Sequence, residues 1–174
     1  ARYQSCRCRA PFLAVLLLLA PPLLGGEAAR PTAAVVDFEI DKGVPAEVAT
    51  GRAVASLLQT HLQTQLKDEF QLVSRDAVEK LLQEQKFSQS ALADEATQKA
   101  MGKILGADYL VTGNVVSLGG VLTITATVVK VETGEIWRSR RVSAKKAEEF
   151  TARLLDLAQA LKLPDADYER AEAN

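Results

Sequence analysis

YLVTGNVVSLGGVLTITATVVK, residues 109–130, is the stretch of this chain that decides its fold. Its two halves are rich in β-branched residues, which favour strands, and Gly119-Gly120 between them predicts a tight turn. After the turn, apolar residues alternate with threonines, as in a strand that buries one face and leaves the other polar. A second turn at residues 132–134 (ETG) and a strand from 135 to 143 complete a predicted three-stranded meander.

Upstream of the meander, the hydrophobic pattern changes several times between the periods of a strand and of a helix. Ser74 and Asp94 are suitable N-caps for two helices, and Gly106 is placed for a left-handed cap at the end of the second. The expected elements are a strand at 34–40, a helix from residue 46, a short strand at 70–73, and helices at 74–86 and 94–105.

After the meander, residues 147–163 predict a last helix that is apolar on one side and ends at Pro164. The predicted order of elements is therefore βαβααβββα. Such an order indicates an α+β two-layer sandwich, with a mixed sheet that ends in the antiparallel meander and with helices on one face. We expect one domain at 33–163 and a charged flexible tail at 164–174.

The N-terminal residues have the composition of a secretory signal. Several arginines precede an apolar run from Phe12 to Ala20, and Gly26-Glu27-Ala28 offers small residues for cleavage. The run is about half of the ~20 residues that a spanning helix needs, so a retained anchor is the less favoured alternative. We expect residues 1–28 to be a cleaved signal peptide, the protein to be exported to the periplasm, and the mature chain to have no transmembrane segment.

The position of the cysteines adds to this expectation. Cys6 and Cys8 both precede the apolar run, so they would be removed together with the signal. The mature domain would then contain no thiol, no disulfide and no cysteine for lipid attachment, and packing alone would stabilise it.

Composition and motifs give little sign of catalysis or of nucleic-acid binding. The chain has 21 basic and 22 acidic residues, whereas a general nucleic-acid binder has a basic surplus. His61 is the only histidine and lies on the apolar stripe of the first expected helix, so we interpret it as a core or boundary residue. Without a second histidine or a nearby cysteine, neither a Ser-His triad nor a zinc site forms.

Asp37 and Glu39 are the remaining candidates for chemistry. They are two residues apart on a predicted strand and should share a face, where paired carboxylates would bind a divalent cation or act as acid and base. The favoured interpretation is a solvated strand edge. We therefore expect no catalytic residue, no metal site and no cofactor.

One predicted surface is a candidate for docking a partner. Arg138 and Arg140 share a face of the last meander strand, and threonines at alternate positions mark the polar face of the strand before it. In a meander, these residues would form a continuous polar sheet face. The alternative is an ordinary solvent-exposed face. The candidate docking residues are Thr123, Thr125, Thr127, Arg138 and Arg140.

Four segments in order along the chain resemble one protein family. They are AVVDFE at 34–39, LVSRDAVEKLLQEQ at 72–85, GKILGADYLVTG at 102–113 and VETGEIW at 131–137. Together they resemble the periplasmic domain of the curli production assembly/transport component (CsgG) family. The segments mark helix caps and hairpin turns, not an active site.

The resemblance implies a non-enzymatic protein that acts through protein–protein interaction in secretion or envelope assembly. The family's channels are lipid-anchored and carry inserted amphipathic hairpins, and this chain leaves no length for such hairpins, so we do not expect it to be a pore by itself. A related group activates penicillin-binding proteins in peptidoglycan synthesis, which is the alternative function. Expected partners are envelope proteins, a second copy included, with peripheral outer-membrane association left open and without nucleic acid or a small-molecule substrate.

Overall fold

A computed structural model describes residues 30–45, 50–85 and 94–172 of the chain. The predicted signal peptide at 1–28 and the segment 86–93 lie outside the described residues. The elements are β1 (Thr32–Val35), β2 (Glu39–Ile40), α1 (Gly51–Gln65), β3 (Gln71–Leu72), α2 (Arg75–Gln85), α3 (Glu95–Leu105), β4 (Tyr109–Leu118), β5 (Val121–Lys130), β6 (Ile136–Ala144), the 3₁₀ turn η2 (Ala147–Glu149), α4 (Phe150–Lys162) and α5 (Asp165–Glu172).

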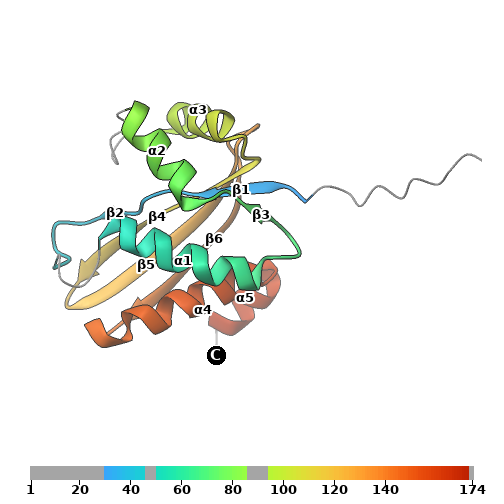
Figure 1. Ribbon diagram of the computed structural model, residues 1–174. Helices are drawn as coiled ribbons and strands as arrows, with labels where there is room; N and C mark the ends of the chain where they lie inside the picture. The colour runs from blue at the N-terminus through green and yellow to red at the C-terminus, as the bar shows by residue number, and fades with distance from the viewer. Residues whose placement is uncertain (1–29, 46–49, 86–93, 173–174) are drawn as a thin grey trace, which may run out of the picture.

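The strands form one mixed sheet in the order β3-β1-β4-β5-β6, with β2 beside β4 (Figure 1). Strand β1 pairs parallel with both β3 and β4, while β4, β5 and β6 pair antiparallel. The predicted meander is thus confirmed. Gly119 and Gly120 join β4 to β5 with φ of 59° and 80°, the left-handed conformation that glycine adopts without strain.

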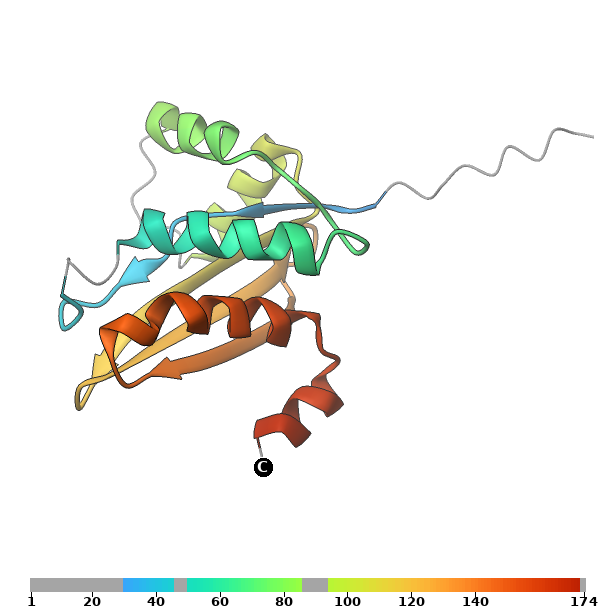
Figure 2. The same ribbon diagram turned by 60° about the horizontal axis from the view of Figure 1, so that its bottom comes forward.

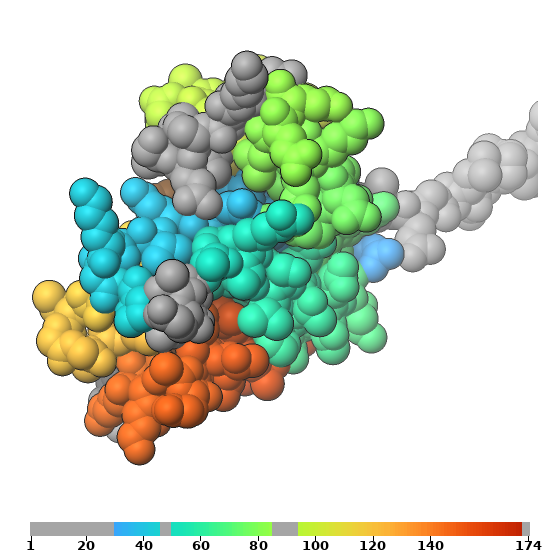
Figure 3. All heavy atoms as spheres, turned by 60° about the vertical axis from the view of Figure 1, so that its left-hand side comes forward, coloured from blue at the N-terminus to red at the C-terminus, as the bar shows by residue number. Residues whose placement is uncertain are grey.

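Helices α1 and α4 lie side by side against one face of the sheet (Figures 2 and 3). Their buried side chains recur at helical spacing, and they meet the alternate apolar residues of β4 and β5. The fully buried members of this core include Val54, Leu58, Leu62, Leu154, Leu157, Leu161, Val115, Ile124 and Val128. A sheet layer and this helix layer make up the α+β two-layer sandwich, which confirms the predicted fold class.

Helices α2 and α3 pack at one end of the other sheet face (Figure 1), so the expectation of helices on one face holds only for α1 and α4. The cause lies in β1, whose residues Ala33, Ala34 and Val35 are all buried. A strand with parallel neighbours is covered on both faces and shows a continuous apolar run. The second, smaller core contains Val78 of α2 and Met101 of α3.

Local signals for the helix ends are confirmed. The Ser74 hydroxyl accepts a hydrogen bond from the Ala77 amide at 3.3 Å, and the Asp94 carboxylate accepts one from the Thr97 amide at 3.0 Å. Gly106 ends α3 with φ of 62°. None of the described helices is long and apolar enough to cross a membrane.

Two predicted segments differ from the structure. The strand expected at 34–40 is divided into β1 and β2, because the chain between them leaves the ladder and Phe38 turns its ring into the main core. The tail expected to be flexible contains α5, which Arg140 holds through Asp165 at 2.6 Å and through the ring of Tyr168.

Gly113 in β4 has no room for a side chain. A Cβ at this position would overlap the carbonyl oxygen of Thr125 on β5 and the ring of Phe38. We therefore expect Gly113→Ala to reduce the free energy of unfolding by about 1–3 kcal/mol, as overpacked core sites do. Urea unfolding measures the change. Gly43→Ala is the control, because its Cβ would meet its nearest neighbour at 3.4 Å, and equal losses in both variants would contradict the prediction.

Candidate protein interaction surface

The polar face of the meander is the most extended candidate surface in the described part of the chain. The β5 threonines Thr123, Thr125 and Thr127 lie opposite Ser143, Arg141 and Ser139 of β6. On the other side of β5, Thr127 lies opposite Thr112 of β4. We call the six hydroxyl residues Thr112, Thr123, Thr125, Thr127, Ser139 and Ser143 the hydroxyl face.

The hydroxyl face is ordered by cross-strand contacts. The Thr123 and Ser143 hydroxyls lie 3.3 Å apart, and those of Thr127 and Ser139 lie 3.1 Å apart. Helices α2 and α3 pack on Ala34, Val36 and Leu110, beyond the end of this face. The face continues into a shallow hollow lined by Glu39, Asp41, Asn114 and Val116. It therefore offers many hydroxyl donors and acceptors on short side chains, and no catalytic base among the six.

The structure does not bring Arg138 and Arg140 onto this face. They lie opposite Val128 and Ala126, so both point to the side that α4 covers. Near the turn, Val129 pairs with Ile136, and that register, continued along the strands, would have placed Arg138 opposite Thr127. A bulge at this point inserts one residue into β6, and a shift of one residue moves every later side chain to the opposite face.

On the covered side, the two arginines bind the C-terminal end of α4. Arg138 donates to the Leu161 carbonyl at 2.6 Å, and Arg140 donates to the carbonyls of Ala160 at 3.1 Å and Leu163 at 2.9 Å. The last carbonyls of a helix have no intrahelical partner and carry partial negative charge, so cations stabilise them. Arg140 is only 5% exposed, which removes it from any docking face. The prediction of one face formed by all five candidate residues is wrong.

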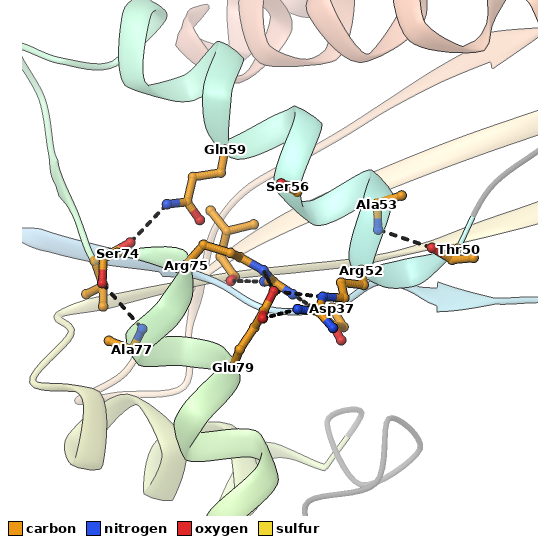
Figure 4. A network of polar contacts seen from close by, with 12 residues as sticks. Asp37, Thr50, Arg52, Ala53, Ser56, Gln59, Ser74, Arg75, Ala77 and Glu79 are labelled. Carbon is orange, nitrogen blue, oxygen red and sulfur yellow. Dashed lines mark hydrogen bonds and ion pairs between the residues drawn. The ribbon is translucent and has the colours of Figure 1, made fainter.

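Asp37 and Glu39 also lie apart. Glu39 sits opposite Asn114, next to the hydroxyl face, whereas Asp37 forms an ion pair with Arg75 of α2 (Figure 4). The irregular residues between β1 and β2 break the alternation that would have placed both carboxylates on one side. The described residues contain no group of three or more histidine, cysteine, aspartate or glutamate side chains that would hold a metal ion.

The Asp37–Arg75 pair belongs to a network that ties β1 to the start of α1 and α2 (Figure 4). Arg75 also donates to the Val35 carbonyl at 3.0 Å and contacts Glu79 at 3.2 Å, and Glu79 in turn accepts from Arg52 of α1 at 2.8 Å. A planar guanidinium suits such a junction, because its several donors lie in fixed directions. The network is structural. The sequence did not indicate the contact between Asp37 and Arg75, because the two residues are 38 positions apart along the chain.

His61 is half-buried on α1, as expected for a boundary residue. Cys6 and Cys8 lie outside the described residues.

We expect Arg75→Met to reduce the free energy of unfolding by about 1–3 kcal/mol, because it leaves the half-buried carboxylates of Asp37 and Glu79 without their central cation. Urea unfolding measures this loss, and the slope of the free energy of unfolding against urea concentration should stay unchanged. Lys80→Met is the matched control on the same helix. Lys80 is exposed, and its contact with Glu84 is long at 3.9 Å. We therefore expect Lys80→Met to reduce the free energy of unfolding by less than about 0.5 kcal/mol. A control as costly as Arg75→Met would contradict the role of the network.

Several solved structures share this fold at low sequence identity. The C-terminal domain of LpoB from Escherichia coli aligns with a TM-score of 0.54 and 19% identity, over 70% of this chain and 87% of that domain. The LpoB C-terminal domain from Salmonella enterica aligns with a TM-score of 0.51 and 19% identity, with the same coverage. A PelC dodecamer from Paraburkholderia phytofirmans aligns with a TM-score of 0.50 and 13% identity, over 78% of this chain and 90% of that one. At these identities, the likeness shows the fold alone.

No curated protein sequence matches the chain significantly. The profile of the family described as "Curli production assembly/transport component CsgG" matches residues 25–122, more than half of the chain. The match includes three of the four segments that resembled this family in the sequence, and it ends where β5 begins. Because this match covers more than half of the chain, the chain belongs to the curli production assembly/transport component (CsgG) family.

Proposed function

We propose that this protein acts through protein–protein contacts in secretion or envelope assembly, and that the hydroxyl face is the surface by which it docks. The proposal places the protein in the periplasm, after export by the signal at 1–28. It assigns no reaction to the chain, and it does not make the chain a pore by itself.

The observation that carries the proposal is an ordered polar sheet face, which none of the described helices packs against over the hydroxyl residues. Two hydroxyl pairs across β5 and β6 already hold each other, so a partner would immobilise few new rotamers. Threonine and serine also lose less rotamer entropy on binding than long charged side chains do. A sheet face of this kind is preorganised for a flat partner surface.

The family and the shared fold support the proposal. The family description names assembly and transport, and the PelC structure is a dodecamer. We infer from these that a second copy of the chain is among the partners. The alternative, an activator of penicillin-binding proteins in peptidoglycan synthesis, remains open, because the LpoB domains share the fold at the same level as the other neighbours.

The double variant Thr123→Lys/Thr127→Lys tests the hydroxyl face. Two long side chains in its centre would hold a docked partner away from the face, so we expect at least a tenfold weaker association. Light scattering and sedimentation of the purified exported protein measure association with a second copy. A pull-down with a purified penicillin-binding protein measures the alternative with the same variants.

Thr151→Lys is the matched control, because it makes the same exchange at an exposed position of α4 on the opposite side of the sheet. It should leave association unchanged, and circular dichroism should show all variants folded. The proposal fails if the wild-type protein is monomeric and binds no penicillin-binding protein, or if the double variant associates as strongly as the control.

A further inference from the structure

Strand β6 is the last strand of the sheet, so one side of its backbone has no neighbouring strand among the described residues. In an antiparallel pair, alternate residues direct their N–H and C=O groups to the partner strand, and the others direct them outward. Arg141 is an outward residue, because both of its backbone groups bond to Tyr168. By alternation, the backbone groups of Ser139 and Ser143 also point outward, and the Ser139 carbonyl already accepts a hydrogen bond from the Arg140 guanidinium at 2.9 Å. Exposed groups of this kind are a template for another strand.

A single hydroxyl of α5 occupies the place of a neighbouring strand at the centre of this edge. The Tyr168 hydroxyl accepts a hydrogen bond from the Arg141 amide at 3.3 Å and donates one to the Arg141 carbonyl at 3.2 Å. An added strand would make the same two bonds to this residue. Tyr168 therefore mimics a strand at one position.

Little of α5 is buried. Besides the hydroxyl, its contacts to β6 include the Asp165–Arg140 ion pair at 2.6 Å and the Tyr168 ring, 4.4 Å from the Arg140 guanidinium. Asp165 is exposed, and no residue of α5 whose burial is described is buried (Figure 2). A helix that buries so little apolar surface is displaced at low cost.

Charge favours one kind of occupant for this edge. From Ile136 to Lys146 the sequence is IWRSRRVSAKK, which has no acidic residue. Of its five basic residues, Arg138 and Arg140 are bound to the end of α4, whereas Arg141, Lys145 and Lys146 are exposed. The helix that covers it, DADYERAE, has four acidic residues and one arginine. The protein thus already presents an acidic segment of its own to a basic edge strand.

We propose that the β6 edge is a docking site for an extended acidic segment of a partner protein, and that α5 is a built-in competitor for this site. The inference rests on the proposed function and deepens it, since it names the chemistry of the partner. The added strand would pair with the outward groups of Arg141 and Ser143 and with the Ser139 amide, since the Ser139 carbonyl is bound by Arg140. Its alternate side chains would lie beside Ser139 and Ser143, so the strand would extend the hydroxyl face.

The test compares the full chain with the variant Asp165→Asn/Tyr168→Phe, which removes the ion pair and the hydroxyl but keeps the aromatic ring. Hydrogen exchange reports whether the Arg141 amide loses protection. The binding probe is a fluorescein-labelled ten-residue peptide of alternating glutamate and valine, and the comparison probe alternates lysine and valine. Asp167→Asn is the matched control, because Asp167 pairs with Arg170 inside α5 at 3.0 Å.

We expect the Arg141 amide to exchange faster in the loosened variant than in the wild-type protein. We also expect this variant to bind the glutamate peptide about tenfold more tightly, because α5 leaves the β6 edge free in a larger fraction of the molecules. The control should bind like the wild-type protein. Binding should weaken with added salt, and the lysine peptide should bind to neither.

Ser143→Pro locates the site, because it removes an outward N–H without removing a backbone bond to β5. Ser143→Ala is its control, since the Ser143 hydroxyl also contacts Thr123 at 3.3 Å and both exchanges remove that contact. We expect Ser143→Pro, added to the loosened variant, to abolish binding of the glutamate peptide. Equal affinity of the wild-type and loosened proteins, binding that survives Ser143→Pro, or equal binding of both peptides overturns the inference. Because self-association is measured separately with the threonine variants, failure here leaves the role of the hydroxyl face standing, and the reverse also holds.

Discussion

One extra residue in β6, at the bulge beside Val128 and Val129, determines what each face of the meander presents. Before the bulge, the pairing would place the arginines beside the β5 threonines. After it, Ser139, Arg141 and Ser143 take that place. The inserted residue is Trp137, whose ring packs against Phe70 at 5.3 Å and Tyr109 at 5.6 Å. Burial of this aromatic group gives the bulge a physical cause, since large rings contribute most to a small core.

The shift in register also supplies what the helix layer needs. Arg138 and Arg140, turned toward α4, donate hydrogen bonds to the carbonyls at the C-terminal end of the helix, where partial negative charge collects. Arg75 has a similar role at the end of β1, where it binds the Val35 carbonyl and the Asp37 carboxylate together. Each buried or half-buried guanidinium lies where backbone acceptors converge, which is where its desolvation is compensated.

The two proposed contacts of the protein adjoin each other for the same reason. β6 provides Ser139 and Ser143 to the hydroxyl face, and the backbone of the same residues forms part of the free edge. A partner at the edge would therefore also touch the face. The acidic helix α5 keeps this edge from unspecific pairing, which open edges otherwise invite. The chain thus has an ordered polar face next to the β6 edge. In this proposal, helix α5 controls access to that edge.

Local patterns in the sequence determined much of the fold. The alternation of threonine with apolar residues in β5, the glycine turn at 119–120 and the caps Ser74, Asp94 and Gly106 act over a few residues, and all are as predicted. The family resemblance rested on the same local segments. Such signals are readable because backbone conformation and side-chain period are set by near neighbours.

Tertiary structure alone decided the composition of the surfaces. No glycine or proline marks the bulge at Trp137, so nothing in the sequence indicated that the arginines would leave the threonine face. The pairing of Asp37 with Arg75 spans 38 residues, and the bond of Tyr168 to the β6 edge spans 27. Contacts over such distances depend on how strands and helices pack, and a one-residue change of register is enough to exchange the two faces of a strand.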